Sequence, residues 1–329
     1  MLRIRGGIGC LLLKEGIVTG CISDYFDVWS EGRSIRCKVR GRLKGEDIKV
    51  LVGDRVLISA GIPGRLCVDG PNAESGRDGT KGFRHLPIQG MIEKVLERKN
   101  ELLRPPIANV DLVVLVFTLK NPNFNARLVD KILVLAESSG IEPILCLNKI
   151  DLLKSGEASP ILEIYQAAGY KVYLTSALTG EGTRRLASGI ANHTAVLAGQ
   201  SGVGKSRLFN ALIPGASARV GDISKKGLRG RHTTKHVELR RLPEGGFLAD
   251  TPGFSRLDME GIRKEELSGF FREMLPWLGR CKFRGCLHKD EPECAVKDAV
   301  SRKIISETRY RSYLDFLEEL HEWETRRYE

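Results

Sequence analysis

The pattern of apolar and polar positions divides the chain into three regions. In the first, up to about residue 104, short apolar segments are broken by glycine, and no long helical pattern occurs. Short strands separated by turn signals are typical of a small β-barrel. We expect its strands at Gly16–Gly20, Ile35–Val39, Val52–Ile58 and Gly90–Leu96. Residues 61–89, rich in Gly, Pro, Asp and Arg, are predicted to form a long loop between two strands.

In the second region, near-continuous apolar runs alternate with helical periodicity. The run Asp111–Phe117 is apolar at almost every position, as expected of a strand that helices cover on both faces. Further strands are predicted at Ile144–Leu147, Lys171–Leu174, Thr194–Ala198, His236–Leu242 and Gly246–Ala249. Helices are predicted at Ala126–Ser138, Pro160–Ala168, Glu181–Ala191 and Arg207–Ile213. This alternation predicts a doubly wound α/β sheet.

The third region combines a cysteine cluster with a helical C-terminus. The cluster lies in residues 281–294, and from Val296 to the end the chain is predicted to be helical. One apolar face of that helix carries Tyr310, Tyr313, Leu314, Leu317 and Leu320. We therefore predict three domains, with bounds 1–104, 105–270 and 271–329.

Composition narrows the range of partners. The chain has 329 residues, of which 42% are hydrophobic and 28% charged, as in ordinary soluble proteins. Its net charge of +11 favours a polyanionic partner, nucleic acid first, although a solvated basic surface has the same composition. For the first region, an oligonucleotide-binding barrel and a plain structural barrel both fit. No apolar run approaches the ~20 residues that span a bilayer, and the apolar start is a poor signal peptide, so we expect a cytoplasmic protein without a membrane partner.

A glycine-rich loop between a predicted strand and a predicted helix carries the strongest chemical signal. It fits the phosphate-loop pattern GxxxxGK[ST] with the residues Gly199, Gln200, Ser201, Gly202, Val203, Gly204, Lys205 and Ser206. Backbone N–H groups of such a loop hold phosphate oxygens, and the N–H of Arg207 is expected to face the α-phosphate. Lys205 is predicted to reach the β- and γ-phosphates, and Ser206 to ligate Mg²⁺. The alternative is a glycine-rich turn that binds nothing.

A second motif, Asn-Lys-x-Asp at Asn148, Lys149 and Asp151, indicates which base is bound. It ends an apolar strand, where ligands sit in open α/β sheets. Only guanine presents N1–H and N2–H₂ side by side, and the carboxylate of Asp151 can accept from both. The Asn148 amide is expected to face the base edge and to tie neighbouring loops together. The stem of Lys149 is expected to lie over the ring. After Ser176, the N–H of Ala177 is expected to donate to guanine O6.

A third motif, Asp250-Thr-Pro-Gly253, also ends a predicted strand. Asp250 is predicted to hold Mg²⁺ through water, and the N–H of Gly253 to detect the γ-phosphate. A simple turn is the alternative interpretation. Many GTPases continue with a glutamine that orients the attacking water, whereas this chain has Phe254, which cannot do so.

A fourth motif, Gly230-Arg-His-Thr-Thr234, lies where a γ-phosphate-sensing switch belongs. Thr233 or Thr234, with Thr234 preferred, is predicted to ligate Mg²⁺. His232 is the candidate for orienting water; the alternatives are that it contacts RNA or only packs. Residues 219–241 carry eight Lys and Arg against two acidic residues, which favours contact with a phosphate backbone.

The cysteine cluster has the composition of a structural zinc site. Three thiolates and one imidazole make a complete tetrahedral set: Cys281, Cys286, His288 and Cys294. Buried free cysteines are the alternative. The remaining five are interpreted as small apolar residues: Cys10, Cys21, Cys37, Cys67 and Cys146.

The order of the motifs is permuted. In most GTPases the phosphate loop comes first and the guanine motif last, whereas here the guanine motif precedes the phosphate loop and Asp-x-x-Gly closes the series. Such a circular permutation is tolerated where chain termini lie exposed and close together. With Val52-Gly-Asp-Arg-Val56, Gly-Arg-His-Thr-Thr and the Cys–His set, nearly the whole chain resembles the RsgA (YjeQ) family of circularly permuted GTPases.

The resemblance implies a fold, an activity and a partner. It implies an oligonucleotide-binding barrel on ribosomal RNA, a catalytic role for His232, and one structural Zn²⁺ on the Cys–His set. We expect a GTP hydrolase that uses GTP/GDP with Mg²⁺ and is a late checkpoint factor on the small (30S) ribosomal subunit. As a monomer it would bind 16S rRNA, be stimulated by the subunit, and be released on hydrolysis. The alternative is a zinc-containing RNA-binding module in which GTP is structural; a phosphate-loop kinase lacks an evident acceptor site.

Overall fold

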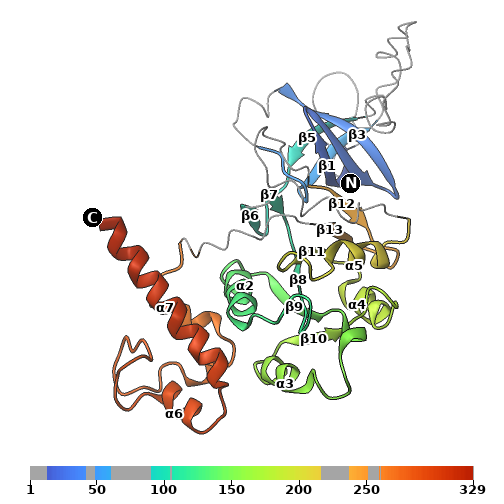
Figure 1. The fold of residues 1–329 in the computed structure, drawn as a ribbon. Coiled ribbons are helices and arrows are strands. Elements are labelled where there is room, and N and C mark those ends of the chain that lie inside the picture. Colours follow the sequence, from blue (N-terminus) through green and yellow to red (C-terminus); the bar gives the residue numbers. More distant parts are fainter. Residues whose placement is uncertain are drawn as a thin grey trace, which may run out of the picture. The chain divides into compact units, whose positions relative to one another are not determined.

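The computed structural model describes the residues 13–41, 49–60, 90–103, 106–215, 237–250, 259 and 261–328. They form two compact units (Figure 1). The first unit consists of the described residues up to Asn109 together with residues 237–239. The second unit consists of the other described residues from Val110 onward. A short segment from late in the sequence thus completes the N-terminal unit, where Glu238 pairs with Gly20 in an isolated β-bridge.

The N-terminal unit contains a closed five-stranded barrel. Its strands are β1 (Leu13–Ile22), β2 (Tyr25–Ser30), β3 (Arg33–Val39), β4 (Arg55–Ala60) and β5 (Gly90–Val95). They pair in the order β1-β2-β3-β5-β4, and β4 pairs with β1 to close the barrel. The interior is filled by apolar side chains, among them Val18, Val28, Ile35, Val56, Ile58 and Ile92. The predicted barrel is confirmed, while the predicted loop at 61–89, with Cys67, lies outside the described residues, as does Cys10.

A buried carboxylate fixes the Val-Gly-Asp-Arg-Val segment beside the barrel. Asp54 is fully buried and accepts hydrogen bonds from the Leu51 N–H at 2.7 Å and from Arg98 at 2.8 and 3.0 Å. Gly53 has a φ of +90°, and a Cβ there would lie 2.0 Å from the carbonyl oxygen of Ala108. That residue ends a small hairpin formed by β6 (Glu101–Leu103) and β7 (Pro106–Ala108). The segment therefore joins barrel and hairpin.

The second unit contains a six-stranded sheet, apart from Leu239, the first residue of the edge strand β12. Its strands are β8 (Leu112–Phe117), β9 (Glu142–Leu147), β10 (Lys171–Leu174), β11 (Thr194–Ala198), β12 (Leu239–Arg241) and β13 (Phe247–Asp250). They run in the order β10-β9-β8-β11-β13-β12, and the four pairings from β10 to β13 are parallel. The helices between them are α2 (Ala126–Ser138), α3 (Ser159–Ala167), α4 (Thr183–Ile190) and α5 (Lys205–Leu212). The predicted doubly wound sheet is confirmed.

Alternate residues of β8 show how helices cover both faces of this sheet. Val114 and Val116 share a buried cluster with α4 and α5. Leu115 and Phe117 point the other way and line a pocket with α2, and the Phe117 ring lies 6.4 Å from that of Tyr165 on α3. Because side chains alternate along a strand, an unbroken apolar run was the correct signal for this position.

The C-terminal part of the second unit is mostly helical and corrects one prediction. It contains the short 3₁₀ turns η2 (Leu267–Phe270) and η3 (Leu275–Trp277), then α6 (Ala295–Ser301) and α7 (Glu307–Tyr328). The single helix predicted from Val296 to the end is wrong, because the chain turns at Lys303, which has a φ of +60°. The break lets α6, Ile305 and α7 pack into one apolar core, whereas a continuous helix would carry them apart.

A buried ion-pair cluster ties α7 to the helices beside the six-stranded sheet. Arg309 is 1% exposed and donates to Asp130 of α2 at 2.7 Å and to Glu273 at 2.7 and 3.1 Å. Tyr165 of α3 donates to the same oxygen of Asp130 at 2.9 Å. Four segments distant in sequence therefore meet at one buried cluster.

Among the helices of the described chain, none combines the length and apolarity that a bilayer crossing requires.

Candidate nucleotide and metal sites

The carboxyl ends of the parallel strands meet at one edge of the sheet. Phe117 ends β8 and lies beside Leu147 of β9, which in turn pairs with Leu174 of β10. On the other side of β8, Leu197 of β11 pairs with the backbone of Asp250. Asn148 and Gly199 directly follow β9 and β11, Ser176 comes two residues after β10, and Asp250 is the last residue of β13. The fold therefore collects at one edge segments that lie far apart in the sequence.

The phosphate loop joins β11 to α5 in a conformation that its glycines require. Gly199 and Gly204 have φ values of +132° and +96°. A Cβ on Gly199 would lie 2.1 Å from the carbonyl oxygen of Val116, and one on Gly204 would lie 2.5 Å from Nδ2 of Asn148. Lys205 opens α5 and donates from Nζ to the carbonyl oxygens of Gly199 and Gln200, both at 2.8 Å. Its ammonium group therefore spans the loop, where phosphate charge is expected.

Asn148 connects the phosphate loop to the base-reading segments. It is 1% exposed and donates from Nδ2 to the carbonyl oxygen of Val203 at 2.9 Å. Its Oδ1 accepts from the Thr175 hydroxyl at 3.2 Å and from the N–H of Ala177 at 3.0 Å. That N–H is the donor expected for guanine O6, and in this structure it is bonded to Asn148 instead. A base oxygen would therefore compete with Asn148 for the donor.

Asp151 is exposed and accepts a hydrogen bond from a neighbouring hydroxyl group. It lies in the 3₁₀ turn η1 (Ile150–Leu152), and its Oδ1 accepts from the hydroxyl of buried Ser176 at 2.5 Å. Lys149, with a φ of +63°, directs its stem toward the phosphate loop, where its Cε would lie 3.8 Å from a Cβ on Gly204. The Asn-Lys-x-Asp segment thus lies beside the phosphate loop.

Part of the predicted site lies outside the described residues. This holds for His232, Thr233, Thr234, Gly253 and Phe254, and for the side chain of Asp250. The backbone of Asp250 ends β13 at the edge where the phosphate loop begins. Ser206 and Arg207 lie in the first turn of α5. Ser201 is exposed at the tip of the loop.

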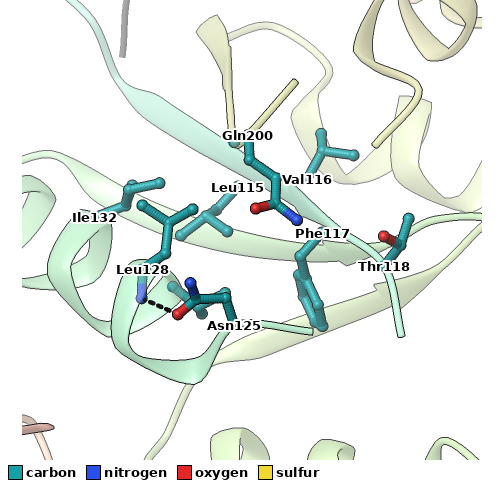
Figure 2. A pocket seen from close by; sticks show the side chains of 10 residues that line it. Leu115, Val116, Phe117, Thr118, Asn125, Leu128, Ile132 and Gln200 are labelled. Carbon is teal, nitrogen blue, oxygen red and sulfur yellow. Dashed lines mark hydrogen bonds between the residues drawn. The ribbon is translucent and has the colours of Figure 1, made fainter. Parts of the chain in front are cut away.

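The connection Thr118–Asn125, which we call the strap, also borders the site, although no sequence motif marks it. It joins β8 to α2, and Asn125 caps α2 by accepting from the Leu128 N–H at 3.0 Å. Beside the strap is a pocket formed by the end of β8, the start of α2 and the phosphate loop (Figure 2). Its polar members are Thr118, Asn125 and Gln200. The strap matches no motif; its helix-capping asparagine and Asn-Pro pair were the available signals.

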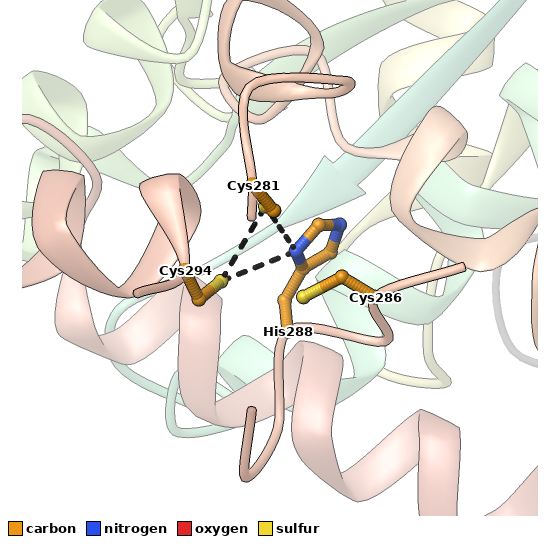
Figure 3. Close-up of side chains that lie close together, drawn as sticks. All are labelled: Cys281, Cys286, His288 and Cys294. Atoms are coloured by element: carbon orange, nitrogen blue, oxygen red, sulfur yellow. Dashed lines mark hydrogen bonds between the residues drawn. The ribbon is translucent and has the colours of Figure 1, made fainter. Parts of the chain in front are cut away.

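The four predicted metal ligands converge in the C-terminal part (Figure 3). The ligand atoms of Cys281, Cys286, His288 and Cys294 all lie within 4.8 Å of one another. The Cys281 and Cys294 sulfurs are 3.8 Å apart, and His288 Nδ1 lies 3.5 and 3.3 Å from them. Tetrahedral zinc, with bonds of about 2.0–2.3 Å, separates its ligand atoms by about 3.5–3.8 Å. The cluster therefore fits a zinc ion.

The surrounding residues hold the metal-ligand loop in place. His288 has a φ of +56°, and its carbonyl oxygen accepts from the Tyr310 hydroxyl at 2.7 Å. The carboxylate of Glu291 accepts from the Leu287 N–H at 2.7 Å and the Lys289 N–H at 2.9 Å. Burial lowers the pKa of His288, which favours the neutral imidazole that binds metal.

Comparison with known proteins identifies the chain. Residues 95–260 match the family described as RsgA GTPase, and residues 15–62 match the RsgA N-terminal domain. A protein from Halalkalibacterium halodurans, described as small ribosomal subunit biogenesis GTPase RsgA, is 42% identical over 320 residues, which cover 96% of this chain and all of that protein. The chain belongs to the RsgA GTPase family.

Other relatives agree over nearly the whole length. A Bacillus pumilus protein of the same description is 42% identical over 94% of this chain and 98% of its own. The crystal structure of YjeQ from Thermotoga maritima is 37% identical with a TM-score of 0.74, covering 94% of this chain and 99% of that one. YloQ, described as a circularly permuted GTPase, is 35% identical with a TM-score of 0.75, covering 94% and 96%.

Membership of the RsgA GTPase family confirms several expectations. The central sheet is a circularly permuted GTPase domain, which the order of the motifs predicted. The family supports GTP hydrolysis and implies GTP or GDP with Mg²⁺ as ligands. Independently of the family, the Cys–His cluster has the geometry of a zinc site. The barrel, the GTPase domain and the cluster occur in the order that the sequence indicated.

Proposed function

We propose that this RsgA-family chain is a GTPase that acts as a late checkpoint in assembly of the small ribosomal subunit. The relatives' descriptions support the process and the small subunit as partner. The observation that carries the nucleotide assignment is the hydrogen bonding of Asn148, which unites the base-reading segments with the phosphate loop. The buried Asn148 amide would thereby join the base-binding half of the nucleotide site to its phosphate-binding half.

The described residues suggest how each part of GTP is held. The phosphate loop, Gly199–Ser206, surrounds the phosphates with backbone N–H groups, and Lys205 supplies the positive charge. For the guanine base we propose Asp151 as acceptor from N1–H and N2–H₂, with Lys149 over the ring. Ser176 orients the carboxylate, and Ala177 lies at the base edge.

The residues around the γ-phosphate complete the proposal. Ser206 and Thr234, with Asp250 through water, would hold Mg²⁺, which when bound offsets charge that develops on the phosphates. Thr233 flanks this group, Gly253 contacts the γ-phosphate, and the N–H of Arg207 faces the α-phosphate. Since Phe254 cannot orient water, His232 does so as general base.

The remaining parts of the chain would grip ribosomal RNA. We propose that the barrel and the basic segment 219–241 contact 16S rRNA, and that the domains 1–104, 105–270 and 271–329 act together as a monomer. The GTP state favours the bound conformation, and hydrolysis lowers the affinity so that the factor leaves. Such a switch needs only different contacts in the two nucleotide states.

The test is GTP turnover with and without purified small ribosomal subunits. We expect the subunit to raise turnover strongly in the wild type. His232→Ala should lower the stimulated rate by about 10²–10⁴-fold, the usual contribution of general base catalysis, with GTP affinity nearly unchanged. His193→Ala, an exposed histidine before β11, is the matched control.

Two results would count against the proposal. If small subunits leave turnover unchanged, GTP is a structural ligand of an RNA-binding module. If His232→Ala turns over like His193→Ala, His232 has no part in the reaction.

A further inference from the structure

The strap, Thr118–Asn125, is held by a hydrogen bond within itself and by aromatic packing against β8 and α3. Near its start, the Thr118 hydroxyl donates to the carbonyl oxygen of Pro122 at 2.7 Å and closes the turn. Near its end, Phe124 packs its ring 5.5 Å from that of Phe117 and 6.3 Å from that of Tyr165. The strap therefore has a defined shape next to the nucleotide site.

Lysines join the strap to the base-reading loop from both directions. Lys149 donates from Nζ to the carbonyl oxygen of Asn121. In return, Lys120 of the strap pairs with Glu157 at 2.6 Å and donates to the carbonyl oxygen of Leu152 at 3.4 Å. Leu152 ends the 3₁₀ turn that contains Asp151. Lys120 therefore contacts the segment that carries the guanine-reading carboxylate.

Glu157 makes this contact part of a larger network. Besides Lys120, its carboxylate accepts from the backbone N–H of Lys154 at 2.9 Å, which closes the turn after the base-reading motif. The Lys120 hydrogen bond and the Lys154 N–H lower the pKa of Glu157, so that the carboxylate is charged near neutral pH. The Glu157 carboxylate thus links the strap to the turn that follows Asp151 in the sequence.

The strap also contacts the phosphate loop. Gln200 donates from Nε2 to the carbonyl oxygen of Asn123 at 3.4 Å. The Pro122 ring lies 3.7 Å from the position that a Cβ on Gly202 would take. The same eight-residue connection therefore borders both loops that the proposed GTP would touch.

We propose that Lys120 and Glu157 are positioning residues of the guanine site: through the strap they hold the Lys149–Asp151 segment at a fixed place relative to the phosphate loop. The inference rests on the proposed function and adds to it two residues outside the motifs. Because GTP and GDP share the base, loss of this contact should weaken both nucleotides by the same factor. It should leave the hydrolysis rate of bound GTP unchanged.

The experiment measures GTP and GDP affinity together with single-turnover hydrolysis of bound GTP. Lys120→Met and Glu157→Gln should each weaken both nucleotides about two- to fivefold, the range for a partly exposed ion pair. The double variant should be no weaker than Lys120→Met alone, since Glu157→Gln removes only the ion pair, which Lys120→Met removes together with the bond to Leu152. Lys120→Arg should restore affinity.

Lys171→Met is the matched control. Lys171 is exposed at the start of β10, outside the Lys120–Glu157 contact, so this variant should bind like the wild type. Melting temperatures measured in parallel show whether any variant is unfolded.

The inference is overturned if Lys120→Met binds both nucleotides like the wild type, or if the losses of the two single variants multiply in the double one. A slower hydrolysis of bound GTP in Lys120→Met, or a loss confined to GTP, would also overturn it. These results differ from failure of the proposed function itself, in which the wild-type chain binds no guanine nucleotide.

Discussion

Single side chains in the proposed nucleotide site are fixed by hydrogen bonds to the protein itself. Asn148 uses both ends of its amide, and Ser176 holds one oxygen of Asp151. Side chains that are already oriented lose little freedom when a ligand binds, so that more of the contact energy appears as affinity. Base selectivity in this family member should therefore depend strongly on the chemistry of one carboxylate.

Asp151→Asn should change the preferred base from guanine to xanthine. The amide can accept with one oxygen only, and its NH₂ group matches the carbonyl that xanthine carries in place of the amino group. Two hydrogen bonds to a charged group contribute about 1.5–3 kcal/mol each, so GTP affinity should fall about a hundredfold or more. Titration of GTP and XTP measures the change, with Asp315→Asn on α7 as control. A variant that keeps its preference for GTP would contradict the role of Asp151.

At the scale of elements, the C-terminal part depends on short pieces that pack around the Cys–His cluster. Cys281 and Cys286 pack against the core that α6 and α7 share, and Cys294 belongs to it and directly precedes α6. The η2 and η3 turns and α6 are too short to be stable helices alone. A metal ion joining the four ligands would hold these elements together.

Cys286→Ser should abolish zinc binding and loosen the C-terminal elements. A structural site that loses one thiolate binds zinc far more weakly, and its binding energy is also folding energy. The wild type should contain one zinc per chain by atomic absorption, and the variant should contain none and melt at a lower temperature. Cys21→Ser in β1 is the control. Equal zinc content in both variants would show that Cys286 is not a ligand.

At the scale of the whole molecule, the described chain consists of two units, and the second is held together by long-range contacts. Arg309 and Asp130 are 179 positions apart in the sequence. Their cluster also includes Glu273, and the guanidinium group lies 4.8 Å from the Phe271 ring centre. Buried charges of this kind stabilise a fold only while all partners are present.

Arg309→Met should strongly destabilise the second unit. It leaves the carboxylates of Asp130 and Glu273 buried without their cation, and breaking such a pair costs about 3–5 kcal/mol. Arg311→Met, at a position with a 73% exposed side chain, is the control and should cost little. Urea unfolding of both variants gives the free energies. Equal values would show that the buried cluster does not stabilise the unit.

The sequence by itself determined the features that depend on local signals. Apolar runs placed β8 and β11, glycine spacing placed the phosphate loop, and the motif order revealed the permutation. The Cys–His spacing likewise indicated a cluster that the structure brings together. In each case a short stretch of chain contains the whole physical requirement.

Only the tertiary structure decided which distant groups meet. It showed the strap beside both nucleotide-binding loops, the Ala177 N–H bonded to Asn148, and the guanidinium group shared by α2 and α7. It also broke the C-terminal helix at Lys303, because two helices can cover a core that one straight helix cannot. Contacts between residues far apart in sequence depend on packing, which local patterns do not contain.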